Sequence, residues 1–415
     1  MDSAIAAAPR RFFGWHVVSA TFVLAAFGWG VGFYGPPIYL HAVIAERGWP
    51  LATVSLAVTV HFACGAAVIA NLPALYRRFG VPAITRAGAG ALALGVVGWA
   101  TAAAPWQLFA ATLLSGAGWV AMGAAAVNAI VAPWFVRKRP AALAMAYNGA
   151  SAGGIVLSPL WVAAIAAFGF PVAAAAIGAV MLVSVGWLAG HYFAATPQQL
   201  GQEPDGEAAP ATRAAAPTPG PAIGRALWRD RRFVTLATGM ALGLFAQIGL
   251  LAHLYSLLVP ALGDAGAGLA MSAATAAAIA GRTLVGWLMP AGADRRLVAA
   301  ASYSVQIAGS AVLLAAGGAS AALLLIGVAL FGSGIGHATS LPPLIAQAEF
   351  AREDVGRVVA LVVAIAQATY AFAPAALGVI RALAGGGDGA AVFIAAATIQ
   401  ALAAAALLGG RRAGP

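Results

Sequence analysis

Long apolar runs follow one another along this chain, separated by short polar or basic segments. Each run is close to the roughly 20 residues that an α-helix needs to cross the core of a bilayer. An unpaired backbone amide costs several kcal/mol in hydrocarbon, so the runs predict membrane-spanning helices. The predicted spans are 13–38, 51–75, 82–103, 106–132, 140–166, 171–193, 233–260, 268–290, 296–316, 320–346, 356–382 and 388–409.

The composition agrees with this interpretation. Of the 415 residues, 62% are hydrophobic and 8% are charged. A soluble domain has about 25% charged residues, and a water-soluble fold could not cover this much apolar surface. We therefore expect an all-α integral membrane protein with twelve transmembrane helices.

The net charge of +10 could indicate a nucleic-acid partner, but the distribution of the charges excludes one. Of the 22 Lys and Arg residues, 19 lie at the chain ends or in alternate loops, which is the positive-inside pattern. Only Arg47 and Arg381 lie on the opposite side, and Arg282 lies within a span. We expect both termini in the cytoplasm. The ratio of 21 Arg to 1 Lys suggests a high-GC bacterial genome, and hence a bacterial inner membrane.

The segment 194–232 is rich in Pro, Gly, Gln and acidic residues and predicts a cytoplasmic linker. It separates two six-helix halves, 1–193 and 233–415. Features of the first half recur in the second after about 215–218 residues, which indicates a repeat with a pseudo-twofold axis along the membrane normal. The matched pairs are Arg77-Arg78 with Arg295-Arg296, Phe135 with Phe350, and Pro159 with Pro374.

Two motifs identify a family resemblance. Pro73 to Gly80 partly matches the signature Gly-x-x-x-Asp-Arg-x-Gly that follows the second span of major facilitator superfamily transporters. The run from Trp134 to Arg139, with Gly149 and Gly153-Gly154 after it, is similar to the fifth-helix signature of monocarboxylate transporters and oxalate/formate antiporters. The resemblance implies the major facilitator fold and a secondary transporter.

Arg282 is the most informative residue, because a charge near the middle of a span costs about 2.5–3.5 kcal/mol. No Asp or Glu lies in the interior of a predicted span, so an anionic substrate is the expected counter-ion, and a guanidinium fits a carboxylate bidentately. Arg282 with Gly286 also resembles the substrate ligand of monocarboxylate carriers. Proton-linked carriers often place an acid one turn earlier, where this chain has Ala278. The alternative is an Arg that snorkels or binds backbone carbonyl groups.

Other polar side chains in the spans could complete a substrate site, although interhelical hydrogen bonding would also explain them. Histidines can donate to a carboxylate and titrate near neutral pH. Tyr34 precedes Gly35, Pro36 and Pro37, where we expect the first helix to break. The remaining candidates are His253, His337, His61, Tyr370, Gln367 and Asn148.

The sequence gives no support for metal, cofactor or acid–base chemistry. It lacks an HExxH motif, paired cysteines and a carboxylate pair within a span. Gly30-x-Gly32-x-x-Gly35 matches a dinucleotide fingerprint but has no preceding strand. We expect no enzyme activity, no cofactor and no metal.

The predicted function is secondary transport of small organic anions, in particular monocarboxylates, by alternating access. The resemblance allows proton symport, anion exchange or facilitated diffusion. The partners are then the anion, the bilayer and, for symport, protons, and we expect a monomer. The alternatives are efflux of amphipathic drugs and, from another class, a membrane enzyme or sensor without transport.

Overall fold

The fold is all-helical, and its helices coincide with the predicted spans. A computed structural model describes residues 12–69, 71–206, 227–290, 292–385 and 389–411, in which there are no strands. The helices of the first half are α1 (Gly14–Gly32), α2 (Gly35–Arg47), α3 (Leu51–Ile69), α4 (Leu72–Phe79), α5 (Val81–Thr101), α6 (Pro105–Ala121), α7 (Ala124–Val131), α8 (Arg139–Phe168) and α9 (Phe170–Leu188). Those of the second half are α10 (Arg231–Leu288), α11 (Arg295–Ala315), α12 (Ala321–Ile335), α13 (His337–Glu349), α14 (Arg352–Tyr370), α15 (Ala373–Leu383) and α16 (Ala390–Gly409).

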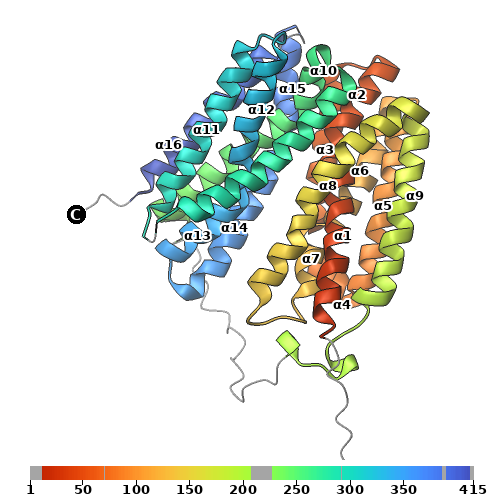
Figure 1. Ribbon diagram of the computed structural model, residues 1–415, viewed down its shortest axis with the longest axis vertical. Helices are drawn as coiled ribbons and strands as arrows, with labels where there is room; N and C mark the ends of the chain where they lie inside the picture. Colours follow the sequence, from red (N-terminus) through yellow and green to blue (C-terminus); the bar gives the residue numbers. More distant parts are fainter. Residues whose placement is uncertain (1–11, 70, 207–226, 291, 386–388, 412–415) are drawn as a thin grey trace, which may run out of the picture.

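The described helices make twelve membrane passes, as predicted. Ten helical segments are long and apolar enough to cross a bilayer. One of them, within α10, contains two passes, because Gly263 takes a left-handed φ of 67° that reverses the chain between them. The short apolar helix α12 continues into α13 and makes a further pass. The helices of the two halves form two bundles that lie side by side in Figure 1.

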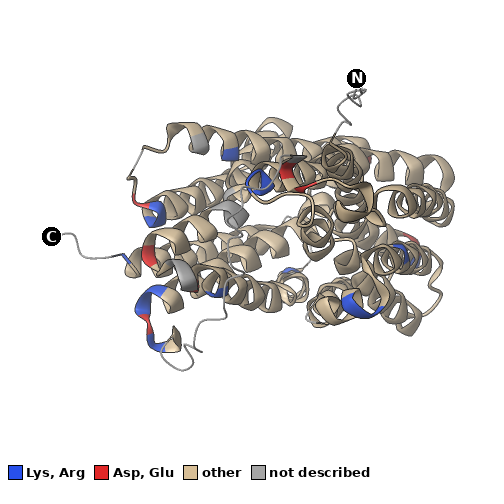
Figure 2. Cartoon of the chain, turned by 90° about the horizontal axis from the view of Figure 1, so that it is seen from below, with Lys and Arg blue, Asp and Glu red and all other residues tan. Residues whose placement is uncertain are grey.

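The two sides of the molecule differ in charge. We call the side where α1 begins and α16 ends the terminal side, and the side of the α10 turn the far side. Figure 2 looks at the terminal side and shows Lys and Arg on its loops and helix ends. The far side carries Arg47, at the end of α2, and Arg381, near the end of α15, as the sequence pattern predicted.

The two bundles contact each other on the far side and near the middle of the membrane. The Ser272 hydroxyl of α10 donates to the Ile155 carbonyl oxygen of α8 at 2.8 Å, and the Ala375 amide donates to Thr59 Oγ1 of α3 at 3.0 Å. Both of these hydrogen bonds lie away from the terminal side. The bundles also diverge toward that side in Figure 1, so this arrangement is closed on the far side.

The first part of the linker packs against the first half. The Asp205 carboxylate accepts the amide hydrogens of Val136, Arg137 and Lys138, and Gln202 Oε1 accepts that of Phe13 at 2.9 Å. Burial alone would raise the pKa of Asp205, but the three amide donors outweigh it and hold that pKa below its usual value. The carboxylate therefore stays ionised at neutral pH and fastens the linker to the start of α8. Residues 207–226 of the predicted linker lie outside the described residues.

A buried ion pair ties the second half together on the terminal side. Arg296, only 1% exposed, forms a bidentate pair with Glu349, with Nε–Oε1 2.6 Å and Nη2–Oε2 2.8 Å. Its remaining hydrogens reach Thr235 Oγ1 and the carbonyl oxygens of Leu407 and Arg232. One guanidinium thus joins α10, α11, α13 and α16. A buried charge of this kind is tolerated because all of its donors are satisfied.

We predict that Glu349→Gln destabilises the second half by about 3–5 kcal/mol, because the buried guanidinium loses its counter-charge. Asp294→Asn is the matched control. It removes the charge of the exposed pair with Arg411, worth about 0–1 kcal/mol, while an Asn still caps α11. Thermal unfolding of the purified protein measures both, and equal unfolding temperatures for the two variants would contradict the prediction.

Candidate functional site

Arg282 lies in the second pass of α10 and reaches the middle of the membrane. Its Nε donates to the Gly336 carbonyl oxygen at 2.9 Å, at the point where α12 ends and α13 begins. The described residues offer it no carboxylate within salt-bridge distance and no hydrogen bond to its two terminal nitrogens. The residue as a whole falls in the exposed class. One edge of the guanidinium is anchored, and its terminal edge is available to a ligand.

Tyr34 of the first half faces Arg282 across the boundary between the halves. Its phenol lies close to the Thr275 side chain and within electrostatic range of the Arg282 guanidinium. Thr275 and Arg282 are seven residues apart on α10 and share one helix face. Gly154 of α8 completes the contact, since a Cβ there would stand 2.7 Å from the Tyr34 ring and 3.0 Å from Thr275 Cγ2. The Arg282 cation and the Tyr34 hydroxyl therefore lie in the same region, where α8, α10 and the α1–α2 junction converge.

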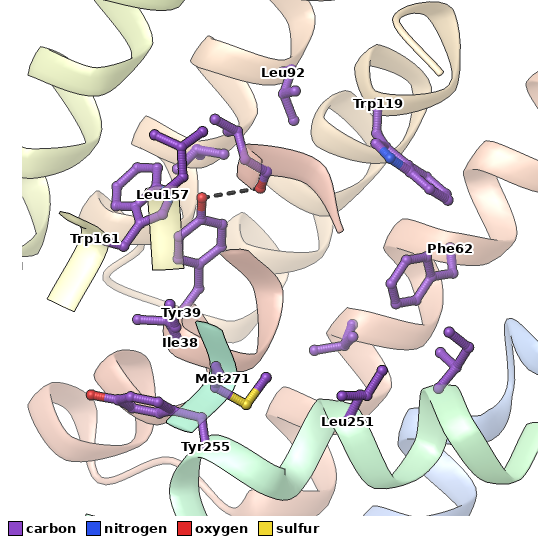
Figure 3. Packing of buried hydrophobic residues seen from close by; sticks show 14 of the residues in the cluster. Ile38, Tyr39, Phe62, Leu92, Trp119, Leu157, Trp161, Leu251, Tyr255 and Met271 are labelled. Atoms are coloured by element: carbon purple, nitrogen blue, oxygen red, sulfur yellow. Dashed lines mark hydrogen bonds between the residues drawn. The ribbon is translucent and has the colours of Figure 1, made fainter. Parts of the chain in front are cut away.

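An apolar layer separates this cluster from the far side. Phe33, Phe62 and Met271, among others, enclose a void of about 10 Å³, room for about one water molecule. Figure 3 shows three side chains that line this void: Phe62 from α3, and Leu251 and Met271 from α10. The Tyr370 ring meets the Phe62 ring edge-on at 6.2 Å, so this predicted site residue belongs to the layer. The layer blocks passage to the far side in this arrangement.

Helix breaks position these groups. The fourth pass breaks between α6 and α7 near Met122, and the tenth between α12 and α13 at Gly336, about 214 residues later. This offset matches the repeat in the sequence. The first pass breaks at Tyr34, as predicted, and the Tyr39 hydroxyl donates to the freed Val31 carbonyl oxygen at 3.0 Å (Figure 3). Discontinuous helices near the midplane are typical of transporter binding sites.

His61 supports the break of the first pass. Pro36 has no amide hydrogen, so the Gly32 carbonyl oxygen four residues earlier lacks its helical donor. His61 Nε2 replaces that donor at 2.8 Å, and Nδ1 contacts Ser115 Oγ at 2.8 Å. The ring is 1% exposed and stacks on Trp119. His61 therefore shapes the wall behind Tyr34, and both of its nitrogens are occupied.

The other predicted site residues do not join Arg282 and Tyr34. His253 is fully buried and its Nε2 donates to the Pro374 carbonyl oxygen at 3.0 Å, nearer the far side. Gln367 is half-buried on α14, and Asn148 is exposed on α8. Neither has a hydrogen bond to another side chain in the described part of the chain. The backbone of His337 begins α13 beside the Arg282 anchor, but its side chain lies outside the described residues.

Sequence reasoning missed Thr275 and Gly154 as members of the cluster. Thr275 could have been found from its spacing of seven residues before Arg282. A groove of about 460 Å³ lies elsewhere, along α10, α11 and α12. Neither Arg282 nor Tyr34 lines it.

The family model described as Major Facilitator Superfamily matches residues 17–374, which is most of the chain. The chain belongs to the Major Facilitator Superfamily. It is accordingly a multi-pass membrane transporter of a small molecule and not an enzyme. No curated protein matches it in sequence.

Solved structures of this superfamily share the fold of the chain. A point mutant of the nucleoside transporter NupG superposes with a TM-score of 0.75 at 12% identity, covering 95% of this chain and 100% of that one. A bacterial homolog of the human lysosomal transporter Spinster, inward-facing and unoccupied, gives 0.71 at 14%, covering 98% and 100%. A D-xylose-proton symporter gives 0.70 at 14%, covering 95% and 97%. At these identities the likeness establishes the superfamily fold and no substrate.

We predict that His61→Leu lowers the stability of this superfamily transporter. The change leaves the Gly32 carbonyl oxygen and Ser115 with one partner fewer inside the bundle, at a cost of about 1–3 kcal/mol for each unsatisfied group. Thermal unfolding measures the effect. His191→Leu, an exposed histidine beyond α9, is the control and is expected to unfold like the wild type. A His61→Leu variant as stable as that control would refute the assigned role.

Proposed function

We propose that this transporter carries small organic anions, in particular monocarboxylates, and that Arg282 binds the carboxylate. One observation carries the proposal: the guanidinium stands where the two halves meet, with one edge anchored to Gly336 and no carboxylate of the described chain beside it. A guanidinium left in this way is stable only with a hydrated cavity or an anionic guest. Its planar fork suits a carboxylate.

The neighbouring groups fit the same ligand. The Tyr34 hydroxyl stands within electrostatic range of the guanidinium, from the opposite half. His61 shapes the wall behind it, and Tyr370 closes the layer above it. His337, Gln367 and Asn148 are further candidates for contact with the substrate, and His253 is considered below. A ligand held by Arg282 and Tyr34 touches both halves, so its binding favours their movement about the site.

We further propose that the halves 1–193 and 233–415 rock as units about the segment 194–232. The basic terminal side would face the cytoplasm of a bacterial cell, in keeping with the positive-inside rule. The inward-facing Spinster homolog, with which the chain superposes along 98% of its length, supports this orientation of the open end. Its energy source would be a solute or ion gradient, and uptake with and without a pH gradient separates symport from exchange and facilitated diffusion.

The decisive experiment compares the wild type with the Arg282→Gln variant. It measures the uptake of radiolabelled acetate, lactate and oxalate into proteoliposomes that contain each protein. Loss of a charge-assisted hydrogen bond costs about 1.5–3 kcal/mol, so initial uptake should fall about 10- to 150-fold. The Arg282→Lys variant keeps the positive charge but loses the bidentate geometry of the guanidinium. Its initial uptake rate should lie between those of the wild type and Arg282→Gln. Arg357→Gln, an exposed arginine of α14, is the control.

Unchanged carboxylate uptake by Arg282→Gln would contradict the proposal. The competing hypothesis, efflux of amphipathic drugs, predicts that an apolar dye is still exported by Arg282→Gln at the wild-type rate.

A further inference from the structure

Three buried polar atoms without a hydrogen-bond partner in the described chain meet between the halves, nearer the far side. They are Ser55 Oγ of α3, His253 Nδ1 of α10 and Arg381 Nε of α15. Ser55 and His253 are both 0% exposed. Unpaired polar atoms are costly in a protein interior. Their gathering at a boundary that must open suggests that they bind a ligand in another state.

Gly378 shows how close these groups lie. A Cβ added to it would stand 2.5 Å from Ser55 Oγ and 3.3 Å from His253 Cε1, so the two side chains lie within about 6 Å of each other. Gly378 and Arg381 are three residues apart and share one face of α15. Arg381 Nη1 donates to Ser256 Oγ at 2.6 Å, and Ser256 donates to the His253 carbonyl oxygen at 2.8 Å. The cluster thus joins both halves through α3, α10 and α15.

The charges around the cluster favour an anion. Arg381 has no carboxylate within salt-bridge distance in the described residues, and the titratable groups that sense its charge are His253 and His41, which are both bases. The nearest acid to His41 is Asp264, at 3.6 Å, and it already accepts a hydrogen bond from Tyr255. From α3, Ser55 reaches the cluster, while Thr59 one turn later already accepts the Ala375 amide hydrogen. Arg381 and Ser55 supply donors for an incoming carboxylate.

His253 adds a proton to this recognition. Its Nε2 faces a carbonyl oxygen, which can only accept, so Nε2 carries the ring hydrogen and the neutral Nδ1 offers a lone pair. A lone pair repels a carboxylate unless a proton lies between them. The cluster therefore favours a carboxylate that arrives with one proton, shared between the carboxylate oxygen and Nδ1.

We propose that Ser55, His253 and Arg381 form a second anion-binding subsite, which opens to the far side when α3 separates from α15 and which takes one carboxylate together with one proton. This proposal rests on the proposed function at Arg282. The subsite would receive the anion first from the far side and pass it to Arg282 once the apolar layer parts. In the closed arrangement Ser55 and His253 are fully buried and Arg381 is half-buried, between α3, α10 and α15.

The test compares uptake of radiolabelled acetate, lactate and oxalate into right-side-out and inside-out membrane vesicles. Arg381→Gln should raise the half-saturation concentration about tenfold or more from the far side, with little change from the terminal side. Arg47→Gln is the matched control, because Arg47 also lies on the far side but donates to the Ala100 carbonyl oxygen within the first half. Size-exclusion chromatography and thermal unfolding test whether each variant is folded. If Arg381→Gln does not fold, Arg381→Lys replaces it in the comparison.

The proton is tested with His253→Gln. Wild-type affinity from the far side should rise as the pH falls, since anion and proton binding favour each other reciprocally. A Gln amide donates at every pH, so this variant should keep its affinity and lose the pH dependence. Three results would overturn the proposal. In Arg381→Gln they are equal changes in the half-saturation concentration from both sides, or no change from either side. In His253→Gln it is a pH dependence as large as that of the wild type. Failure of the Arg282 function has a different signature, because Arg282→Gln would then keep its uptake from both sides.

Discussion

The cost of placing charge in hydrocarbon organises this molecule. Most of the arginines that the structure describes lie on the terminal side, where water or lipid headgroups can solvate them. Three arginines within the bundles meet this cost in different ways. Arg296 is enclosed and all of its donors have partners, so it stabilises the second half. Arg282 and Arg381 each make one hydrogen bond within the described chain, which leaves donors for a ligand.

Backbone satisfaction is the second constraint. Prolines and glycines interrupt several passes near the midplane, and each interruption frees backbone oxygens that must find a donor in the absence of water. His61 supplies one to Gly32 and Tyr39 supplies one to Val31. The same breaks give the passes their irregular shape at the site. The side-chain hydrogen bonds at these breaks therefore also determine which side chains face the other half.

The sequence predicted the helices well, because the length and polarity of each run record the membrane directly. The predicted spans and the observed helices agree within a few residues at most ends, and the break at Tyr34 follows from its prolines. Pairings across the bundle were less accessible. Arg296 has the sequence context of a loop cation, and nothing local shows that Glu349, 53 residues later, pairs with it in the interior. Likewise, the spacing of His61 gave no sign that its partners would be Gly32 and Ser115. A single sequence records burial periodicity but not which distant residues meet.

The central claim is that Arg282 binds a negatively charged guest, and equilibrium binding tests it most directly. Binding of radiolabelled carboxylates to the purified protein can be competed with unlabelled carboxylates and with their uncharged amides, which have nearly the same shape. The account predicts saturable binding that carboxylates displace at least about tenfold more effectively than the matching amides, the effect of about 1.4 kcal/mol. Displacement by acid and amide at equal concentrations would contradict it, because recognition would then depend on shape without charge.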